Sequence, residues 1–306
     1  MSIIFFGTPE FAVPSLKSLM GSDEDVSLVV TQTDKVKGRG HTLSPPPVKV
    51  TAQEAGVRVL QPDTLKDELF FRELLSVEPE FIIVVAYGKI LPGTILDLPL
   101  RGCINLHASL LPKYRGAAPI AWAIIRGDER TGITSMLMDE GLDTGSILLQ
   151  REIEISKEDT TGNLGRKLSD LGASLLIETI RGIRDGSVQP VPQAGETSYA
   201  PLLNKEDGCI DWSRSAGELF NFVRGMQPWP GAFCHIGNER VTLLKTMPAD
   251  GEGTPGVISG IEKDAFLIGT GRGLLSILEL QPAGRKPMSA SAFVHGRKLA
   301  EGITVH

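Results

Sequence analysis

The first two thirds of the chain alternate short apolar runs with amphipathic segments, and this alternation constrains the fold more than any other feature. The run over 81–86 is apolar at nearly every position, which is typical of a strand buried on both faces of a parallel sheet. Strands that alternate with helices predict an open, mostly parallel α/β sheet with right-handed crossovers. The expected strands are 3–6, 26–31, 57–60, 81–86, 104–106 and 134–138, and the expected helices are 10–20, 64–76, 119–126 and 160–184.

The composition changes after residue 185. The stretch 186–206 is rich in Gly, Pro, Ser and Gln, which indicates an extended linker. One expected helix over 216–224 and several short strands follow, at 232–236, 240–244, 256–260, 265–269 and 274–280. This count favours a small closed β-barrel of the OB type. We therefore expect a first domain over 1–185, a linker over 186–206 and a second domain over 207–306.

Composition and charge exclude several classes of protein. With 41% apolar and 22% charged residues, and no apolar run near the roughly 20 residues that span a bilayer, the chain reads as a globular protein without a membrane segment. Three scattered cysteines are too few for a disulfide framework, so a reducing cytoplasm is the expected location. The net charge of −6 argues against a general nucleic-acid binder.

One segment reverses the acidic character of the first domain. Lys35, Lys37, Arg39 and Lys49 have no acidic residue among them, whereas residues 1–204 carry 20 basic and 26 acidic residues in total. Residues 205–306 are neutral, with 11 of each sign. A polyanionic partner would therefore have to be bound locally, by this basic segment and by the neutral C-terminal part.

Two polar segments carry the residues suited to chemistry. Asn105 and His107 lie two residues apart at the end of an expected strand, so that both project from one face, where parallel sheets bind ligands. An amide donor can stabilise an oxyanion, and a histidine can donate to it or move a proton. The loop 138–145 adds carboxylates after another apolar strand, and one of them could orient His107 and accept a proton from an attacking amine.

Simpler interpretations of these residues remain open at this point. An Asn-x-His at a strand end is often structural, and an Asp-rich loop is often a turn closed by its own hydrogen bonds. A zinc site is less favoured, because the chain has five histidines and no H-E-x-x-H motif. A dinucleotide loop after the first strand is improbable as well, since Pro9 occupies the position of the second glycine of G-x-G-x-x-G.

The two segments together resemble a known signature. Asn105-Leu-His107-Ala-Ser-Leu-Leu-Pro112, followed by Gly141-Leu-Asp143-Thr-Gly145, is similar to the paired motifs of the folate-dependent formyltransferases. The resemblance implies a Rossmann-like catalytic domain in which Asn105, His107 and Asp143 are the catalytic residues. The chain departs from the family at Ala108, where glycine is common, and this leaves the three polar positions unchanged.

Further motifs are similar to the members of this family whose acceptor is the methionine of an initiator methionyl-tRNA. They include 6–14, the basic segment with 44–50, and the C-terminal stretches 210–213, 224–232 and 283–288. The resemblance implies formyl transfer from 10-formyltetrahydrofolate to the α-amine of that methionine, a basic insertion that enters the tRNA acceptor arm, and an OB-like tRNA-binding domain. The candidate tRNA contacts are Lys35, Lys37, Arg39, Lys49, Arg224, Lys245, Arg285 and Lys286.

The same resemblance supplies a folate site, and the residues suggest how it holds the ligand. Backbone groups would read the polar edge of the pterin while apolar side chains form a wall. The candidate contacts are Tyr87, Gly88, Ile90, Leu91, Ser109, Leu110, Leu111, Pro112, Asp139 and Leu142. We expect no metal and a monomer. Two alternatives stay open: a formyltransferase that acts on an amino-sugar nucleotide, and a non-catalytic RNA-binding protein with this fold.

Overall fold

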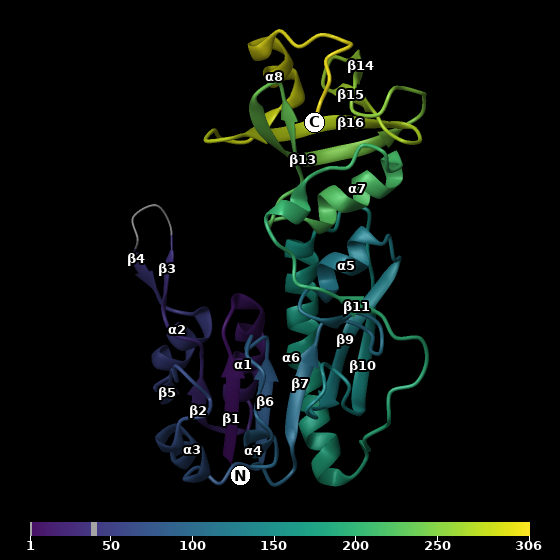
Figure 1. Cartoon of the computed structure of the whole chain (residues 1–306). Helices are drawn as coiled ribbons and strands as arrows, with labels where there is room; N and C mark the ends of the chain where they lie inside the picture. The colour runs from purple at the N-terminus through teal and green to yellow at the C-terminus, as the bar shows by residue number, and fades with distance from the viewer. Residues whose placement is uncertain (1, 38–41) are drawn as a thin grey trace. The chain divides into compact units, whose positions relative to one another are not determined.

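The computed structural model describes residues 2–37 and 42–306, and these form two compact units (Figure 1). Unit 1 comprises residues 1–116, 131–153 and 165–199, and unit 2 comprises 117–130, 154–164 and 200–306. The units are therefore discontinuous in sequence. The segments 117–130 and 154–164, which the sequence-based boundaries assign to the first domain, belong structurally to unit 2.

Unit 1 contains a seven-stranded sheet in the order β10-β9-β7-β6-β1-β2-β5. The strands β5, β2, β1, β6 and β7 run parallel, and β9 runs antiparallel to β7. The predicted open, mostly parallel α/β sheet is thus confirmed. The strands are β1 (Ser2–Gly7), β2 (Asp25–Val30), β5 (Val59–Leu60), β6 (Phe81–Val85), β7 (Cys103–His107), β9 (Arg130–Leu137) and β10 (Ile147–Glu154).

Helices and two short strand pairs complete this part of the chain. The helices are η1 (Glu10–Ala12), α1 (Val13–Met20), α2 (Pro47–Glu54), α3 (Glu68–Leu75), α4 (Gly93–Leu96) and α6 (Thr161–Asp185). One pair is the hairpin β3 (Lys35–Lys37) with β4 (Thr42–Ser44), and the other joins β8 (Arg115–Gly116) to β11 (Tyr199–Ala200). Helix α2 was missing from the sequence-based expectation. Its first residue is Pro47, which is well tolerated at a helix start because the first turn needs no N–H donor.

Helices cover both faces of the sheet, so polar side chains can reach a ligand only at the ends of the strands. On one face the buried residues of β6 pack with Phe70 and Leu74 of α3 and with Ile95 of α4. On the other face α6 lies so close to the sheet that a Cβ at Gly172 would be 2.5 Å from Ile133 and 3.4 Å from Leu106. Because side chains alternate along a strand, the odd-numbered residues of β7 project away from α6.

Unit 2 is built around an antiparallel curled sheet, or half-barrel, in the order β12-β13-β16-β15-β14, with β17 paired to β16. The antiparallel OB-like architecture is thus as predicted, with the difference that the strands form a curled sheet rather than a fully closed barrel. The chain end contributes isolated bridges at both edges, Ile236 with Val305 and Val257 with Thr304. The elements are α5 (Pro119–Ile125), η2 (Glu206–Gly208), α7 (Ala216–Gly225), β12 (Phe233–Ile236), β13 (Glu239–Ala249), β14 (Ile258–Ile261), β15 (Phe266–Gly269), β16 (Leu274–Pro282), β17 (Met288–Ser289) and α8 (Ala290–Arg297).

Among the helices of the described residues, none is long and apolar enough to span a membrane.

A buried ion-pair network fixes the C-terminal end of α6 to unit 1. Arg184 donates to both carboxylate oxygens of Glu24, each at 2.7 Å, and to Glu80 at 2.6–3.1 Å, while Arg101 donates to Glu80 at 3.0 Å. Glu80 is 3% exposed. Burial alone would oppose its ionisation, but the hydrogen bonds and charges of Arg184 and Arg101 outweigh this effect and hold the pKa of Glu80 below its usual value.

We expect Arg184→Met to destabilise the protein by about 3 kcal/mol at pH 7, because it leaves the buried Glu24 carboxylate without its cation and Glu80 with Arg101 alone. Arg181→Met on the exposed side of the same helix is the matched control. The pKa of Glu80 is lowered on folding, so the stabilisation is present above the usual glutamate pKa and is lost as the pH falls through the lower folded value. Urea unfolding at pH 7 and under acidic conditions measures this. Equal unfolding free energies for the two variants at pH 7 would contradict the role of the network.

Candidate active site

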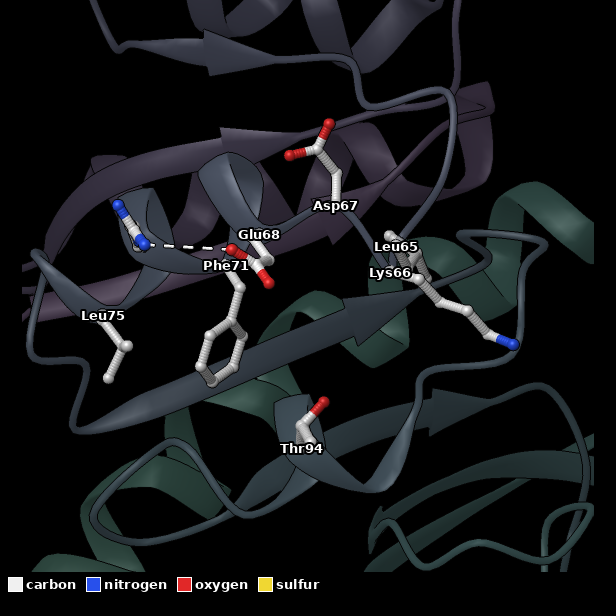
Figure 2. A pocket seen from close by; sticks show the side chains of 8 residues that line it. Leu65, Lys66, Asp67, Glu68, Phe71, Leu75 and Thr94 are labelled. Atoms are coloured by element: carbon white, nitrogen blue, oxygen red, sulfur yellow. Dashed lines mark ion pairs between the residues drawn. The ribbon is translucent and has the colours of Figure 1, made fainter.

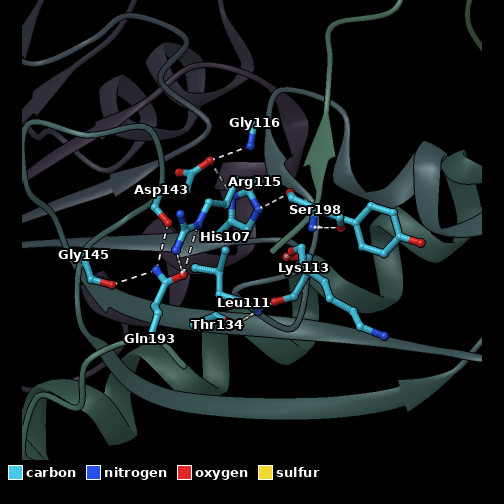
Figure 3. Close-up of polar contacts among 12 residues, drawn as sticks. His107, Leu111, Lys113, Arg115, Gly116, Thr134, Asp143, Gly145, Gln193 and Ser198 are labelled. Atoms are coloured by element: carbon cyan, nitrogen blue, oxygen red, sulfur yellow. Dashed lines mark hydrogen bonds and ion pairs between the residues drawn. The ribbon is translucent and has the colours of Figure 1, made fainter. Parts of the chain in front are cut away.

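His107 and Asp143 lie together although 35 residues separate them in sequence. His107 ends β7 and is 6% exposed, and Asp143 lies in the loop between β9 and β10. The distance between His107 Nδ1 and Asp143 Oδ2 is 3.6 Å, within ion-pair range but too long for a hydrogen bond. Figure 3 shows the carboxylate beside the imidazole ring. The structure therefore brings together two of the three predicted catalytic residues.

Backbone groups of the segment after β7 fix both side chains. His107 Nε2 is 2.8 Å from the carbonyl oxygen of Tyr114, and the Gly116 N–H donates to Asp143 Oδ2 at 2.7 Å. A carbonyl only accepts, so Nε2 carries a proton and Nδ1 is the nitrogen that faces Asp143. Tyr114 has a positive φ of 60°, an uncommon conformation for an aromatic residue, and Ser198 Oγ accepts its N–H at 2.9 Å.

Asn105, the third predicted catalytic residue, lies on the same strand, β7, as His107. It lies two residues before His107, so strand alternation puts both side chains on the face away from α6. Asn105 is half-buried, and its side-chain amide has no hydrogen-bond partner among the described residues. An unengaged amide at the edge of a site can donate to a ligand oxygen. Among the described residues, no hydrogen bond or ion pair joins the Asn105 side chain to His107 or Asp143.

The loop after β6 contains four of the predicted folate contacts. Tyr87 is buried and packs edge-on against Phe6, and burial raises the pKa of its hydroxyl to about 12. Its carbonyl oxygen is occupied, because Thr8 Oγ1 and Gln32 Nε2 donate to it at 3.1 and 2.8 Å. Gly88 has φ of 80° and would hold a Cβ 2.6 Å from Gln32 Nε2. Leu91 is buried, whereas Ile90 is 86% exposed.

The segment that follows His107 is mostly buried. Ser109 is fully buried, and its hydroxyl donates to the carbonyl of Lys113 at 2.6 Å, so this side chain closes its own turn. Leu111 is 4% exposed, and its N–H donates to Thr134 Oγ1 at 3.2 Å. Leu110 and Pro112 are half-buried. Ser109 and Leu111 are thus hydrogen-bonded within the protein, whereas Leu110 and Pro112 are more accessible to a ligand.

The loop 138–146 closes on itself through Asp139. Its carboxylate accepts from Gly141 N at 3.0 Å and from Thr144 Oγ1 at 2.6 Å, which leaves Asp139 with a turn-forming role in this structure. Leu142 is 57% exposed. A Cβ at Gly93 would be 2.8 Å from Glu140, so this loop approaches the segment that follows Ile90 and Leu91. Two exposed apolar side chains, Ile90 and Leu142, thus lie on neighbouring loops.

The predicted basic segment divides into cations with different surroundings. Lys35 is exposed on β3, and Lys37 is the last residue of that strand, whereas Arg39 lies outside the described residues. Lys49 belongs to α2, and its ammonium donates to Asp34 at 2.9 Å and to Gln61 at 2.7 Å. No acidic residue lies among these cations in the sequence, but the fold brings Asp34, which precedes them, to Lys49.

The predicted cations of unit 2 also differ. Arg224 is half-buried, and its guanidinium donates to the carbonyls of Ser156 and Asp159 and to Asn221 Oδ1 at 2.6–2.9 Å. These bonds fix it within the unit. Lys245 on β13 is exposed, as are Arg285 and Lys286 in the turn before β17.

A hollow of about 370 Å³ opens elsewhere in unit 1, along α3 and beside Thr94 of α4 (Figure 2). None of the predicted site residues lines it. Asp67 caps α3 by accepting from Leu69 N and Phe70 N, and Arg72 pairs with Glu68 at 3.8 Å with both side chains exposed. The polar side chains that line the hollow thus stabilise helix α3. His107 and its surroundings therefore remain the candidate active site.

Comparison with known proteins agrees with the geometry. Residues 1–180 match the model of the formyl transferase family, and residues 202–298 match its C-terminal domain. Methionyl-tRNA formyltransferase of Thermodesulfovibrio yellowstonii is 55% identical over 98% of this chain and 97% of its own length. Two solved structures share the fold. WlaRD, a sugar 3N-formyl transferase, is 20% identical with a TM-score of 0.68, and the match covers 94% of this chain and 99% of WlaRD. Methionyl-tRNA formyltransferase from Clostridium thermocellum is 20% identical with a TM-score of 0.58, and the match covers 81% of this chain and 93% of that chain.

The fold and the site thus define a formyl-transferring enzyme. At the level of sequence the chain belongs to the formyl transferase family, in the group of the methionyl-tRNA formyltransferases.

Sequence reasoning missed the groups that hold the site together. The Tyr114 carbonyl and the Gly116 N–H are backbone groups, and the residue type at a position does not predict a contact made by its backbone. Gln193 was assigned only to the extended linker, yet its amide contacts Asp143, Gly145 and Arg115. No local pattern around Gln193 indicates these partners, which are 48 to 78 residues away.

The two glycines that frame Asp143 give a test of how tightly the loop is built. A Cβ at Gly145 would clash with the carbonyl oxygen of Leu137, which is fixed backbone, whereas a Cβ at Gly141 would meet the Thr144 side chain, which can rotate away at the cost of its hydrogen bond to Asp139. We expect Gly145→Ala to lower the free energy of unfolding by about 2 kcal/mol or more, and Gly141→Ala to have a clearly smaller effect. Chemical denaturation of both variants measures the difference, and a Gly145→Ala protein as stable as Gly141→Ala would refute the close approach.

Proposed function

We propose that this protein transfers the formyl group of 10-formyltetrahydrofolate to the α-amino group of the methionine on initiator methionyl-tRNA. The observation that carries the proposal is the 55% identity to a methionyl-tRNA formyltransferase over 98% of the chain. The pairing of His107 with Asp143 supports it, because it supplies a proton acceptor at the end of the strand that also carries the Asn105 amide. The acceptor belongs to translation, so we infer a cytoplasmic location.

The side chains perform two tasks in the reaction, stabilisation of the developing oxyanion and uptake of the amine proton. The amine nitrogen attacks the formyl carbon, and the Asn105 amide stabilises the oxygen on which negative charge develops. Because Nε2 of His107 already donates to Tyr114, the reacting groups can use only Nδ1. This nitrogen, with the Asp143 carboxylate 3.6 Å away, takes up the proton that the amine loses. The bond from the formyl carbon to N10 then breaks, and N10 gains a proton to give tetrahydrofolate.

The described residues fit a folate cosubstrate in two respects. Exposed apolar side chains at Ile90 and Leu142 offer a wall that is otherwise costly to leave in water. The loop 138–142 leaves backbone groups at an exposed surface, where they can bind the polar edge of a pterin. WlaRD, which shares the fold, was solved in the presence of dTDP and 5-N-formyl-THF. We therefore assign the donor site to the loops after β6 and β9.

A competition between acceptors tests the function. We expect the protein to release tetrahydrofolate from 10-formyltetrahydrofolate when methionyl-tRNA is present and not when an amino-sugar nucleotide replaces it. Asn105→Ala should lower kcat about 10²- to 10³-fold, the usual loss for one oxyanion donor. Release of tetrahydrofolate with the amino-sugar nucleotide alone would favour the sugar formyltransferase. Failure of both acceptors with the wild-type protein would favour a binding role, and full activity of Asn105→Ala would remove that residue from the mechanism.

The contrast between Lys35 and Lys49 tests the tRNA-binding role of the hairpin. Lys35→Ala should weaken tRNA binding and reduce the salt dependence of log K by about one unit, because one phosphate contact is lost. Lys49→Met should leave this slope unchanged, since its ammonium is bonded to Asp34 and Gln61. Affinities measured across a series of salt concentrations decide between them. A reduced slope for Lys49→Met with a normal slope for Lys35→Ala would reverse the assignment.

A further inference from the structure

Gln193 is held by hydrogen bonds, although it lies in the extended, mostly exposed stretch that follows α6. The residues on either side of it, from 191 to 197, are exposed, but Gln193 is half-buried. Just before it, Val191 exchanges two backbone hydrogen bonds with Ile147 of β10, each 2.8 Å long, so the stretch is docked on unit 1 at this point. The side chain of Gln193 then makes four hydrogen bonds (Figure 3).

The partners of Gln193 require an amide at this position. Its Nε2 donates to the carbonyl oxygens of Asp143 and Gly145, both at 2.8 Å, and its Oε1 accepts from Arg115 at 2.6 and 3.1 Å. A guanidinium only donates and a carbonyl only accepts, so the orientation of the amide follows from its partners. A glutamate could not donate to the two carbonyls, and a lysine could not accept from the guanidinium.

These four bonds join the two segments that hold His107. One segment carries the Asp143 carboxylate near Nδ1, and the other carries the Tyr114 carbonyl at Nε2 and the Gly116 N–H on Asp143. Asp143 also has a positive φ of 53°, a backbone conformation that its surroundings must maintain. Gln193 is bonded to the backbone of Asp143 itself and, through Arg115, to the segment of Tyr114 and Gly116.

We propose that Gln193 is a positioning residue for formyl transfer, which sets the distance between the Asp143 carboxylate and His107 by bonding both segments at once. This inference rests on the proposed function for its kinetic consequences. Gln193 bonds to the loop at Asp143 and Gly145, beyond the stretch 138–142 that we assign to folate, so its loss acts on the chemical step more than on the binding of either substrate. A displacement of the order of 1 Å at a catalytic group reduces the rate by about 10²-fold.

The kinetic test compares Gln193→Ala with Gln189→Ala. Gln189 lies in the same stretch and is exposed, and its side chain donates to the carbonyl of Gly186, so it is a matched control. We expect Gln193→Ala to lower kcat about ten- to a hundredfold, with KM for 10-formyltetrahydrofolate and for methionyl-tRNA within twofold of wild type. Gln193→Glu should be at least as slow, because its carboxylate would face two carbonyl oxygens. Equal kcat for Gln193→Ala and Gln189→Ala would overturn the proposal.

A measurement without substrates separates this proposal from the proposed function. The contacts of the His107 ring can be followed at one fixed pH through the NMR chemical shifts of its ring nitrogens, assigned with a His107→Gln variant. We expect these shifts to change in Gln193→Ala, because the Asp143 carboxylate moves relative to Nδ1, and to stay at the wild-type values in Gln189→Ala, with similar melting temperatures for both. If the wild-type protein formylates no methionyl-tRNA but the His107 shifts change in Gln193→Ala, the proposed function fails and the positioning role stands. Unchanged His107 shifts in Gln193→Ala would refute the positioning role whatever the protein catalyses.

Discussion

The antiparallel pairing of β9 with β7 is the constraint on which the site depends. In this register Leu137, at the end of β9, is opposite Ile104, near the start of β7, and the N–H of Met138 donates to the carbonyl of Cys103. The loop that carries Asp143 therefore starts at the far end of β7 from His107 and must turn back along the strand to reach it. The close approach of Gly145 to Leu137 and the turn closed by Asp139 are what this return requires.

The same pairing explains how much of the site the sequence could predict. The fully apolar run of β6 indicated a parallel sheet, and Asn105 and His107 were placed correctly on one strand face, because both inferences follow from local periodicity. The sequence contains no signal for the direction of β9, which depends on long-range pairing. Only the resemblance to a family singled out Asp143 among the acidic residues of its loop, and the distance of 3.6 Å to His107 gives that choice a physical basis.

The sequence predicted the buried apolar positions better than it predicted which cations are paired, because the pairing also depends on contacts between residues that are distant in sequence. Whether a lysine is free depends on which carboxylates the fold brings to it, and for Lys49 the partner is Asp34, 15 residues away on the other side of the hairpin. Arg224 is similar, because it is bonded to two carbonyls that belong to the segment before α6. Counting signs along the chain identified a basic segment, but it could not separate cations that stabilise the fold from cations that are exposed to a polyanion.

The choice of a neutral residue at position 193 follows from the electrostatics of the site. In the proposed mechanism the Asp143 carboxylate attracts a proton through His107, and a cation hydrogen-bonded to the same loop would compete with that proton for the carboxylate. A carboxylate there would bind Arg115 but repel the carbonyls of Asp143 and Gly145. An amide fixes the loop with two donors and an acceptor while adding no charge of its own. The stretch that carries it thus belongs to unit 1 and is bonded to the loop of Asp143, although its composition is that of a linker.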